Sequence, residues 1–169
     1  MPGDRYLYNN LGTITEKASI QTSAGLTDAG KIPAIDGTGR LDTSFMPVGI
    51  AADSAAITTT EALAAGDLVN IYNSSGAKCR KADASTAGKE AHGFVVAAVA
   101  NGATATVYFE GSNAQVTGLT PGVQFLSATT PGLTTSTAPS ATGQVVQRVG
   151  FATSATSFNF QSMLPVVLA

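Results

Sequence analysis

The sequence predicts an all-β protein, with a small barrel or sandwich head that follows an extended, largely non-regular N-terminal arm. After residue 50, short runs rich in β-branched and aromatic residues recur, and Gly and Pro separate them. Asn101-Gly102 joins two such runs, and Asn-Gly favours a β-hairpin because both residues tolerate the positive φ of a type I′ turn. Pro121-Gly122 is typical of a type II turn. Short strands with this punctuation indicate an all-β head.

Residues 1–50 differ in character from the rest of the chain. Gly, Pro, Asp, Asn, Thr and Ser occur throughout, and the apolar residues follow neither the period of a strand nor that of a helix. Such a segment cannot bury enough apolar surface to fold alone, yet it is too apolar for an idle linker. We therefore expect an arm over residues 1–50 that orders on a partner surface, and a β head over residues 51–169.

The first half of the head predicts a helical turn and two strand pairs. Thr58 and Glu61 have the spacing of a helix capping box, so residues 58–65 are expected to form a short helical turn. The run DLVNIY at 67–72 alternates apolar and polar residues, as a strand does. Further expected elements are a turn at 73–76, a strand at 77–82, a loop at 83–91, and a hairpin of 92–100 with 104–110.

The second half predicts shorter strands. Val95 and Val96 are adjacent, which gives residues 92–100 two apolar faces and a central position in the sheet. Phe158 and Phe160 share one face of a strand by the period of two. Because residues 163–168 are apolar and contain a proline, they suit an edge strand or an interface. The remaining expected strands are 115–117, 123–127 and 132–135, and 144–152 paired with 156–161.

Composition disfavours several partners. Charged residues form 12% of the chain, against about 25% in typical soluble proteins. Few long side chains must be ordered when such a surface meets another protein, which favours an assembly component. The net charge is −2 and the only basic cluster lies at 78–81, so nucleic-acid binding is not expected. We expect no signal peptide, because the N-terminus MPGDRYLYNN lacks the charged-then-apolar pattern of one. We expect no membrane span, because the longest apolar stretch, 93–100, is far short of the about 20 residues that a spanning helix needs.

No set of catalytic or metal-binding residues stands out. His92 is the single histidine and is expected to be structural. Cys79 lies between cations in a strand, but strand neighbours point to opposite faces, so we expect an inert thiol. The loop from Asp36 to Asp42 lacks the third-position ligand and the terminal Glu of an EF-hand, and a turn is expected there. We therefore expect no enzyme, no cofactor and no metal site.

Two parts of the sequence resemble phage virion proteins. Residues 29–47, AGKIPAIDGTGRLDTSFMP, resemble a segment of the form GKI…GxLDxSxLP that is common in these proteins. The following residues resemble small bacteriophage capsid decoration proteins, which are also called cement or head-stabilisation proteins. The resemblance covers residues 24–160. It rests on the residues at 65–69, 81–83, 88–94, 107–111, 118–122 and 149–152.

This resemblance implies a structural function. It implies a small β-barrel or β-tulip on the outer surface of the phage head in the virion, often a homotrimer, that bridges neighbouring copies of the major capsid protein. Such a protein would be made in the host cytoplasm. The segment at 29–47 also occurs in tail-fibre and baseplate proteins, so a structural component of the tail, fibre or baseplate is a second hypothesis. A carbohydrate-binding or hydrolytic β-domain is a third, although the chain has no Trp on which a sugar could stack and no evident pair of acids.

The candidate site residues are contact residues of the arm. Aromatic residues dominate binding hot spots, which favours the cluster of Tyr6, Leu7 and Tyr8 as anchors to the capsid or to a neighbouring subunit. The alternative for each candidate is packing against the chain's own β head. The further candidate arm contacts are Ile32, Pro33, Phe45, Met46 and Pro47.

Overall fold

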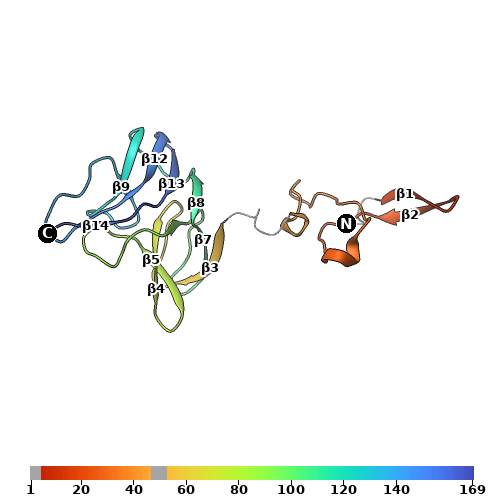
Figure 1. Ribbon diagram of the computed structural model, residues 1–169, viewed down its shortest axis with the longest axis horizontal. Helices are drawn as coiled ribbons and strands as arrows, with labels where there is room; N and C mark the ends of the chain where they lie inside the picture. The colour runs from red at the N-terminus through yellow and green to blue at the C-terminus, as the bar shows by residue number, and fades with distance from the viewer. Residues whose placement is uncertain (1–4, 47–52) are drawn as a thin grey trace. The chain divides into compact units, whose positions relative to one another are not determined.

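The structure is a computed structural model that describes residues 5–46 and 53–169 (Figure 1). The chain divides into two compact units, Met1–Ala52 and Asp53–Ala169. We call them the N-terminal unit and the head, and describe each separately. The described residues are almost entirely strands, turns and loops, so the predicted all-β class is confirmed.

The N-terminal unit contains more regular structure than the non-regular arm that we expected. Strands β1 (Arg5–Asn10) and β2 (Thr13–Ala18) pair antiparallel from Arg5↔Ala18 to Asn10↔Thr13. Leu11 and Gly12 form the two-residue turn between them, both with positive φ, as a type I′ turn requires. Two short 3₁₀ turns follow, Gly25–Asp28 and Thr43–Phe45.

The first part of the head is a closed barrel with the strand order β3-β5-β4-β6-β7. The predicted hairpin around residues 73–76 is confirmed, because β4 and β5 pair antiparallel from Val69↔Lys81 to Asn73↔Ala77. The parallel pairing of β3 with β5 and the antiparallel pairing of β3 with β7 complete the ring. The strands are β3 (Ser54–Thr59), β4 (Leu68–Asn73), β5 (Ala77–Lys81), β6 (Gly93–Phe94) and β7 (Thr104–Tyr108).

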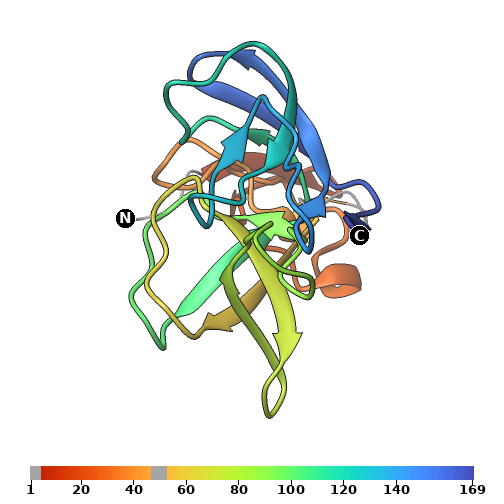
Figure 2. The same ribbon diagram turned by 90° about the vertical axis from the view of Figure 1, so that its left-hand side faces the viewer.

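A second sheet follows with the order β10-β9-β12-β13-β8. Seen end-on in Figure 2, the barrel strands (yellow and green) lie on one side of the head and most strands of this sheet (cyan and blue) on the other. The predicted last hairpin is confirmed as β12–β13, and the expected C-terminal edge strand as β14, which pairs only with β11. The strands are β8 (Glu110–Asn113), β9 (Gly122–Leu126), β10 (Thr134–Thr135), β11 (Val145–Val146), β12 (Arg148–Ser154), β13 (Ser157–Gln161) and β14 (Val166–Val167).

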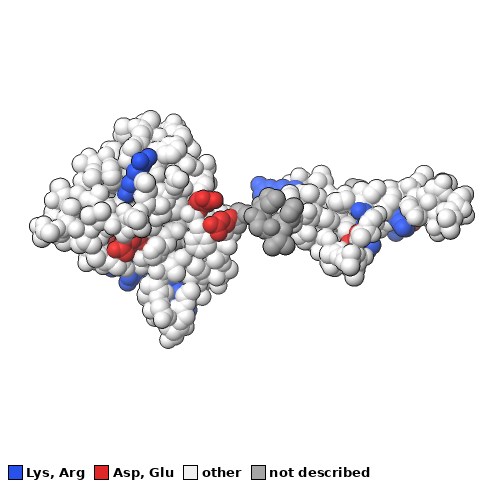
Figure 3. Space-filling view, viewed as in Figure 1, with Lys and Arg blue, Asp and Glu red and all other residues white. Residues whose placement is uncertain are grey.

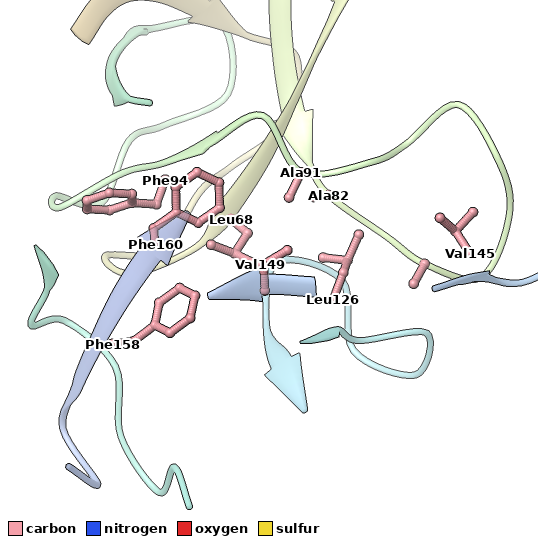
Figure 4. Close-up of a cluster of buried hydrophobic side chains, with 10 residues drawn as sticks. Leu68, Ala82, Ala91, Phe94, Leu126, Val145, Val149, Phe158 and Phe160 are labelled. Carbon is pink, nitrogen blue, oxygen red and sulfur yellow. The ribbon is translucent and has the colours of Figure 1, made fainter. Parts of the chain in front are cut away.

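Two hydrophobic clusters form the core, and both lie within the head. The larger cluster joins the barrel to the second sheet, because Leu68 and Phe94 of the barrel pack with Phe158 and Phe160 of β13 (Figure 4). The predicted common face of Phe158 and Phe160 is confirmed, since both side chains are buried. The smaller cluster fills the barrel with the side chains of Ile57, Leu63, Val69, Cys79, Val95, Ala105 and Val107.

The predicted helical turn at 58–65 is wrong. Thr58 and Thr59 belong to β3, where both are paired with β5. The Glu61 carboxylate accepts a hydrogen bond from the Lys81 backbone N–H at 2.8 Å, so it serves the barrel and does not cap a helix. The β-branched Thr run suits the pleated sheet, and this tertiary pairing overrides the local capping signal.

The predicted hairpin of residues 92–100 with 104–110 is only partly right. The strand on its first side, β6, has two residues and pairs with β7 only at Phe94↔Tyr108. Beyond Phe94 the backbone binds a different segment: the Val95 N–H donates to the Asp67 carbonyl at 3.0 Å, and residues 63 and 99 exchange hydrogen bonds of 2.9 Å. Val95 is buried, but Val96 is 38% exposed, so this stretch does not have two covered faces.

The short strand expected at 115–117 is also absent. The Gln115 N–H instead binds the side chain of Asn113, which is a local turn contact at 3.0 Å. The expected strands at 123–127 and 132–135 are present in shortened or shifted form as β9 and β10.

Candidate functional site

The N-terminal unit differs from the head in burial. None of its described residues, 5–46, is buried, whereas every core residue lies in the head. Apolar side chains are nonetheless frequent in the N-terminal unit. The large apolar residues exposed there are Leu7, Tyr8, Leu11, Ile14, Leu26, Ile32, Ile35, Leu41 and Met46. We take this unit as the candidate functional site, because its exposed apolar side chains accompany no buried residue among those described, and exposed apolar surface is a candidate for interaction.

The β1–β2 hairpin has two chemically different faces. Residues directly opposite each other in an antiparallel pair lie on the same face. One face, which we call the aliphatic face, carries Leu7 and Ile14, with Arg5 and Glu16 joined by an ion pair of 3.6 Å. Leu7 is 77% exposed and Ile14 is 62% exposed, so this face is uncovered.

The other face of the hairpin, which we call the aromatic face, carries Tyr6 and Tyr8. The Lys17 ammonium lies 3.8 Å from the centre of the Tyr8 ring. At an exposed site such a cation–π contact contributes about 0.5–1 kcal/mol. The contact leaves this face partly covered, since Tyr8 is 40% exposed and Tyr6 is half-buried.

Leu11 stands at the tip of the hairpin in an unfavourable backbone conformation. Its φ is +52°, and its side chain is fully exposed. The left-handed region costs an ordinary residue roughly 1–2 kcal/mol, and Gly or Asn is the usual occupant of such a turn. The Asn9 side chain supports the turn by accepting a hydrogen bond of 2.8 Å from the Gly12 N–H. A large apolar side chain at this strained position makes Leu11 a candidate contact residue.

Hydrogen bonds, and not a core, hold residues 20–46 together. Ile20 bridges to the segment at Pro33, with the Ile20 N–H donating to the Ile32 carbonyl at 3.0 Å. The Ser23 N–H donates to the Ser44 hydroxyl at 2.7 Å and so joins this segment to the second 3₁₀ turn. Each such bond contributes only about 0.5–1.5 kcal/mol net.

The loop from Asp36 to Asp42 forms the turn that its residues predict. The Asp36 carboxylate accepts from the Thr38 hydroxyl at 2.7 Å, from the Thr38 N–H at 2.8 Å and from the Arg40 N–H at 3.0 Å. These bonds, of which the one from the Thr38 hydroxyl counts most, hold the pKa of Asp36 below its ordinary value of 3.8. The Ser44 hydroxyl and N–H lower the pKa of Asp42 in the same way, and Asp42 caps the 3₁₀ turn.

The predicted contact residues fall into two groups within this unit. Tyr6, Leu7 and Tyr8 lie on β1, where Leu7 points to the opposite face from the two tyrosines. Ile32 and Met46 are exposed, Pro33 is exposed at the bridge to Ile20, and Tyr6 and Phe45 are half-buried. Pro47 lies outside the described residues.

Sequence reasoning missed Leu11, Ile14 and Leu26, which are among the exposed apolar residues of this unit. The Leu11-Gly12 pair between Tyr-Leu-Tyr and Thr-Ile-Thr was the available signal for the hairpin. Leu is not a usual residue for a turn, so the signal was weak.

The reactive residue types of the head have structural roles. The His92 ring accepts a hydrogen bond at Nδ1 from the Ile71 N–H at 3.0 Å. Cys79 is buried in the barrel, and burial raises the pKa of its thiol, which keeps the thiol protonated and unreactive. Among the described residues, 5–46 and 53–169, no three His, Cys, Asp or Glu side chains are grouped closely enough to hold a metal ion.

The basic cluster at 78–81 is also engaged within the head. Arg80 donates to the Asn70 side chain at 3.0 Å and to the Gly88 carbonyl at 2.8 Å, and it lies over the Tyr72 ring. Lys81 forms an ion pair of 3.2 Å with Asp67, whose side chain is 5% exposed. Two cations of this cluster, Arg80 and Lys81, therefore already have partners within the head. On the face of the head drawn in Figure 3, charged side chains are few and scattered.

The head has one further apolar surface, along its C-terminal segment. Met163, Leu164, Val166 and Val167 are exposed there, and Leu164 is 92% exposed. Met163, Leu164 and Val166 border an open groove of about 580 Å³, which also includes Phe125, Val146, Arg148 and Gln161. This surface lies on a unit that already has its own core, in contrast to the N-terminal unit.

Comparison of the chain with protein-family models, with curated proteins and with solved structures gives no significant match in any of the three. In the part of the chain that the structure describes, no helix has the length and apolarity needed to cross a membrane. The difference in burial between the two units is therefore the main basis for a functional proposal.

Proposed function

We propose that this chain is a non-enzymatic structural protein of a phage virion, which decorates the outer surface of the capsid and stabilises it. The N-terminal unit attaches to the major capsid protein and to neighbouring copies of the chain, which form a homotrimer. The observation that carries the proposal is the uneven burial: a head with a complete core, and an apolar unit in which no described residue is buried. The resemblance of residues 24–160 to decoration proteins supplies the virion context.

A partner surface would supply the hydrophobic stabilisation that the N-terminal unit lacks. Full burial of a Leu, Ile or Met side chain stabilises by about 1.5–3 kcal/mol. Ile32, Ile35 and Met46 are between 43% and 59% exposed, so each retains much of this free energy for a contact. Several moderate contacts suffice for a clamp, because attachment of several copies around one axis raises the effective concentration of each.

The low charge of the chain, 12% of its residues, favours an assembly component. It does not single out the N-terminal unit, because 9 of the 20 charged residues lie at 1–50. The resemblance of residues 29–47 to segments of tail-fibre and baseplate proteins supports a second candidate, a structural component of the tail, fibre or baseplate. Both candidates use the same uncovered unit, and they differ in where the protein lies on the virion.

A binding assay tests the capsid proposal. Capsids of the parent phage that lack this protein are mixed with the purified full chain and sedimented. We expect Ile32→Ser combined with Met46→Ser to lower the bound fraction at least tenfold, while the matched control Leu164→Ser, an exposed apolar residue of the head, binds like the wild type. Equal loss in both variants, or in neither, would contradict attachment through the N-terminal unit. Electron cryo-microscopy of the virion separates a capsid position from a tail position.

A further inference from the structure

The open groove of the head contains a cation that has no partner within the chain. Arg148 of β12 is paired with Phe125 of β9, and both residues line the groove. Among the described residues, no ion pair and no side-chain hydrogen bond involves the Arg148 guanidinium. Glu110 is the one acidic residue in the strands of this sheet, and it forms no ion pair with Arg148. The groove therefore presents a positive charge that is free to bind a carboxylate.

The apolar surface around Arg148 continues beyond the groove. Val123 is two residues from Phe125 and so lies on the same face of the sheet. Val123 is paired there with Phe151, and the two residues are 41% and 37% exposed. Within the groove itself, Leu164 is 92% exposed. The head has a complete core without these side chains, and exposed apolar patches with polar groups beside them mark interaction sites.

The form and charge of this surface favour a segment of protein over the other classes of ligand. A small molecule usually has about 70–90% of its surface buried in its pocket, which an open groove does not provide. Anionic membranes attract clusters of Lys and Arg, whereas Arg148 is the single cation that lines the groove and the chain has a net charge of −2. The groove volume of about 580 Å³ is suited to a few side chains of a linear segment.

We propose that this groove binds a linear segment of a second protein, with apolar side chains against Val146 and Leu164 and one carboxylate paired with the Arg148 guanidinium. Arginine and a carboxylate form parallel, charge-assisted hydrogen bonds, which strengthen once the partner excludes water. The inference goes beyond the proposed attachment to the capsid. The N-terminal unit serves that attachment, and the groove gives the head a contact with a different protein.

Selection from a displayed library of random short peptides tests the predicted chemistry. The library is first depleted on the full chain with Met163→Ser and Leu164→Ser, which removes peptides that bind elsewhere, including those that bind the N-terminal unit. It is then selected on the wild-type full chain. We expect the enriched peptides to combine apolar residues with Asp or Glu. Enrichment of no peptide, or of peptides without an acidic residue, would overturn the proposal.

A double-variant cycle then tests the ion pair with one enriched peptide, made synthetically and labelled for fluorescence anisotropy. Arg148→Gln should raise the dissociation constant at least tenfold, and replacement of the acid of the peptide by its amide should do the same. Both changes together should cost little more than either alone, because each removes the same pair. Additive losses would contradict a direct contact between the two groups.

Lys78→Gln is the matched control. Lys78 is a cation of the barrel strand β5 that forms no ion pair among the described residues and does not line the groove. Its substitution should leave the dissociation constant unchanged. An equal loss in Lys78→Gln and Arg148→Gln would show a general attraction of charge and would overturn the site. Arg148 and Leu164 are exposed, so all variants should melt at the temperature of the wild type.

Two further measurements separate this proposal from its competitors. Vesicles of phosphatidylcholine with phosphatidylglycerol should not bind the chain through the groove. Vesicle binding that Arg148→Gln abolishes would assign the surface to lipid and overturn the proposal. Capsid sedimentation should be unaffected by Arg148→Gln. A wild-type chain that binds the peptides and not the capsids would refute the proposed function alone, and the reverse result would refute the groove alone.

Discussion

At the scale of single residues, Leu11 shows how local strain and exposure coincide. A Leu at φ +52° accepts an unfavourable conformation and exposes its whole side chain to water. Neither the strained backbone nor the exposed apolar side chain stabilises the isolated chain. Both become understandable if the side chain enters an apolar surface of a partner, because burial then offsets the backbone cost of roughly 1–2 kcal/mol.

The substitution Leu11→Asn separates the backbone cost at this turn from the contribution of the apolar side chain to binding. Asn is favoured at this turn position, so the hairpin should be stabilised or unchanged. Loss of the apolar side chain should nevertheless weaken capsid attachment by about 1.5–3 kcal/mol if Leu11 is fully buried there. Sedimentation with capsids gives the affinity. Unchanged or tighter binding would show that the tip faces solvent in the virion.

Gly150 provides a second test at this scale, in the head. Its φ is +138°, and a Cβ there would collide with the Asn159 carbonyl oxygen of the neighbouring strand β13. Gly150→Ala should destabilise the head by about 2–5 kcal/mol, because overpacking and positive φ both cost free energy. Thermal or denaturant unfolding measures the change.

Gly111→Ala is the matched control for Gly150→Ala. Gly111 also has a positive φ, of +113°, but a Cβ there would meet no heavy atom within 4 Å. Gly111→Ala should lower the free energy of unfolding only by the cost of the positive φ, about 1–2 kcal/mol. Equal losses at the two positions would contradict the collision with Asn159.

At the scale of elements, the loop from Asp36 to Asp42 depends on ionised carboxylates. Both pKa values lie below the ordinary value of 3.8 because Thr38 and Ser44 donate to the charged forms. A lowered pKa in the folded state adds stability above the unfolded pKa, and that stability is lost as the pH falls through the folded value. The order of this loop should therefore persist at neutral pH and decline in strong acid.

Nuclear magnetic resonance of the Thr38 and Ser44 amides measures this dependence. We expect both signals to remain constant from pH 7 to pH 5 and to shift together below about pH 3.8, the ordinary value for Asp. Asp36→Asn should remove the shift at Thr38 and leave that at Ser44. A transition above pH 5 would contradict the stated cause.

At the scale of the whole molecule, core and contact surface belong to different parts of the chain. All buried residues among those described lie between 57 and 160. The larger cluster ties the barrel to the second sheet, and the Gln147 side chain adds hydrogen bonds to both the N–H and the carbonyl of Ala91, at 2.7 and 2.9 Å. Stability and attachment are therefore expected to respond to different substitutions.

Deletion of residues 1–50 tests this separation. The shortened chain should unfold at the same temperature as the full chain, because none of the described core residues is removed. It should no longer sediment with capsids and should no longer form the trimer. A large drop in melting temperature would instead show that the candidate contact residues pack on the chain's own head.

Local signals account for the parts of the fold that sequence reasoning predicted correctly. The hairpins β4–β5 and β12–β13 join neighbouring runs through short turns, and alternation identified Phe158 and Phe160 as inward-facing. The failures occurred where a distant segment competed with a local one. Residues 95–99 bind the backbone at 63–67, and Thr58 and Thr59 bind β5, neither of which lies nearby in the chain.

The sequence predicted that the candidate site lies in the N-terminal region, but it did not predict the β1–β2 hairpin there. The apolar content of Tyr6, Leu7 and Tyr8 marked the N-terminal region, but their apolar pattern did not alternate as a half-buried strand does. The hairpin has apolar side chains on both faces, so the usual period of two could not reveal it.

Composition and short-range turn chemistry were sufficient to establish the all-β class and the change in character near residue 50. They could not establish which apolar residues are covered. Burial depends on pairing between segments far apart in the chain, such as the closure of β3 onto β7 and the packing of Phe94 on Phe160. Among the described residues, that pairing places every buried side chain in the head and leaves the apolar side chains at 5–46 without cover.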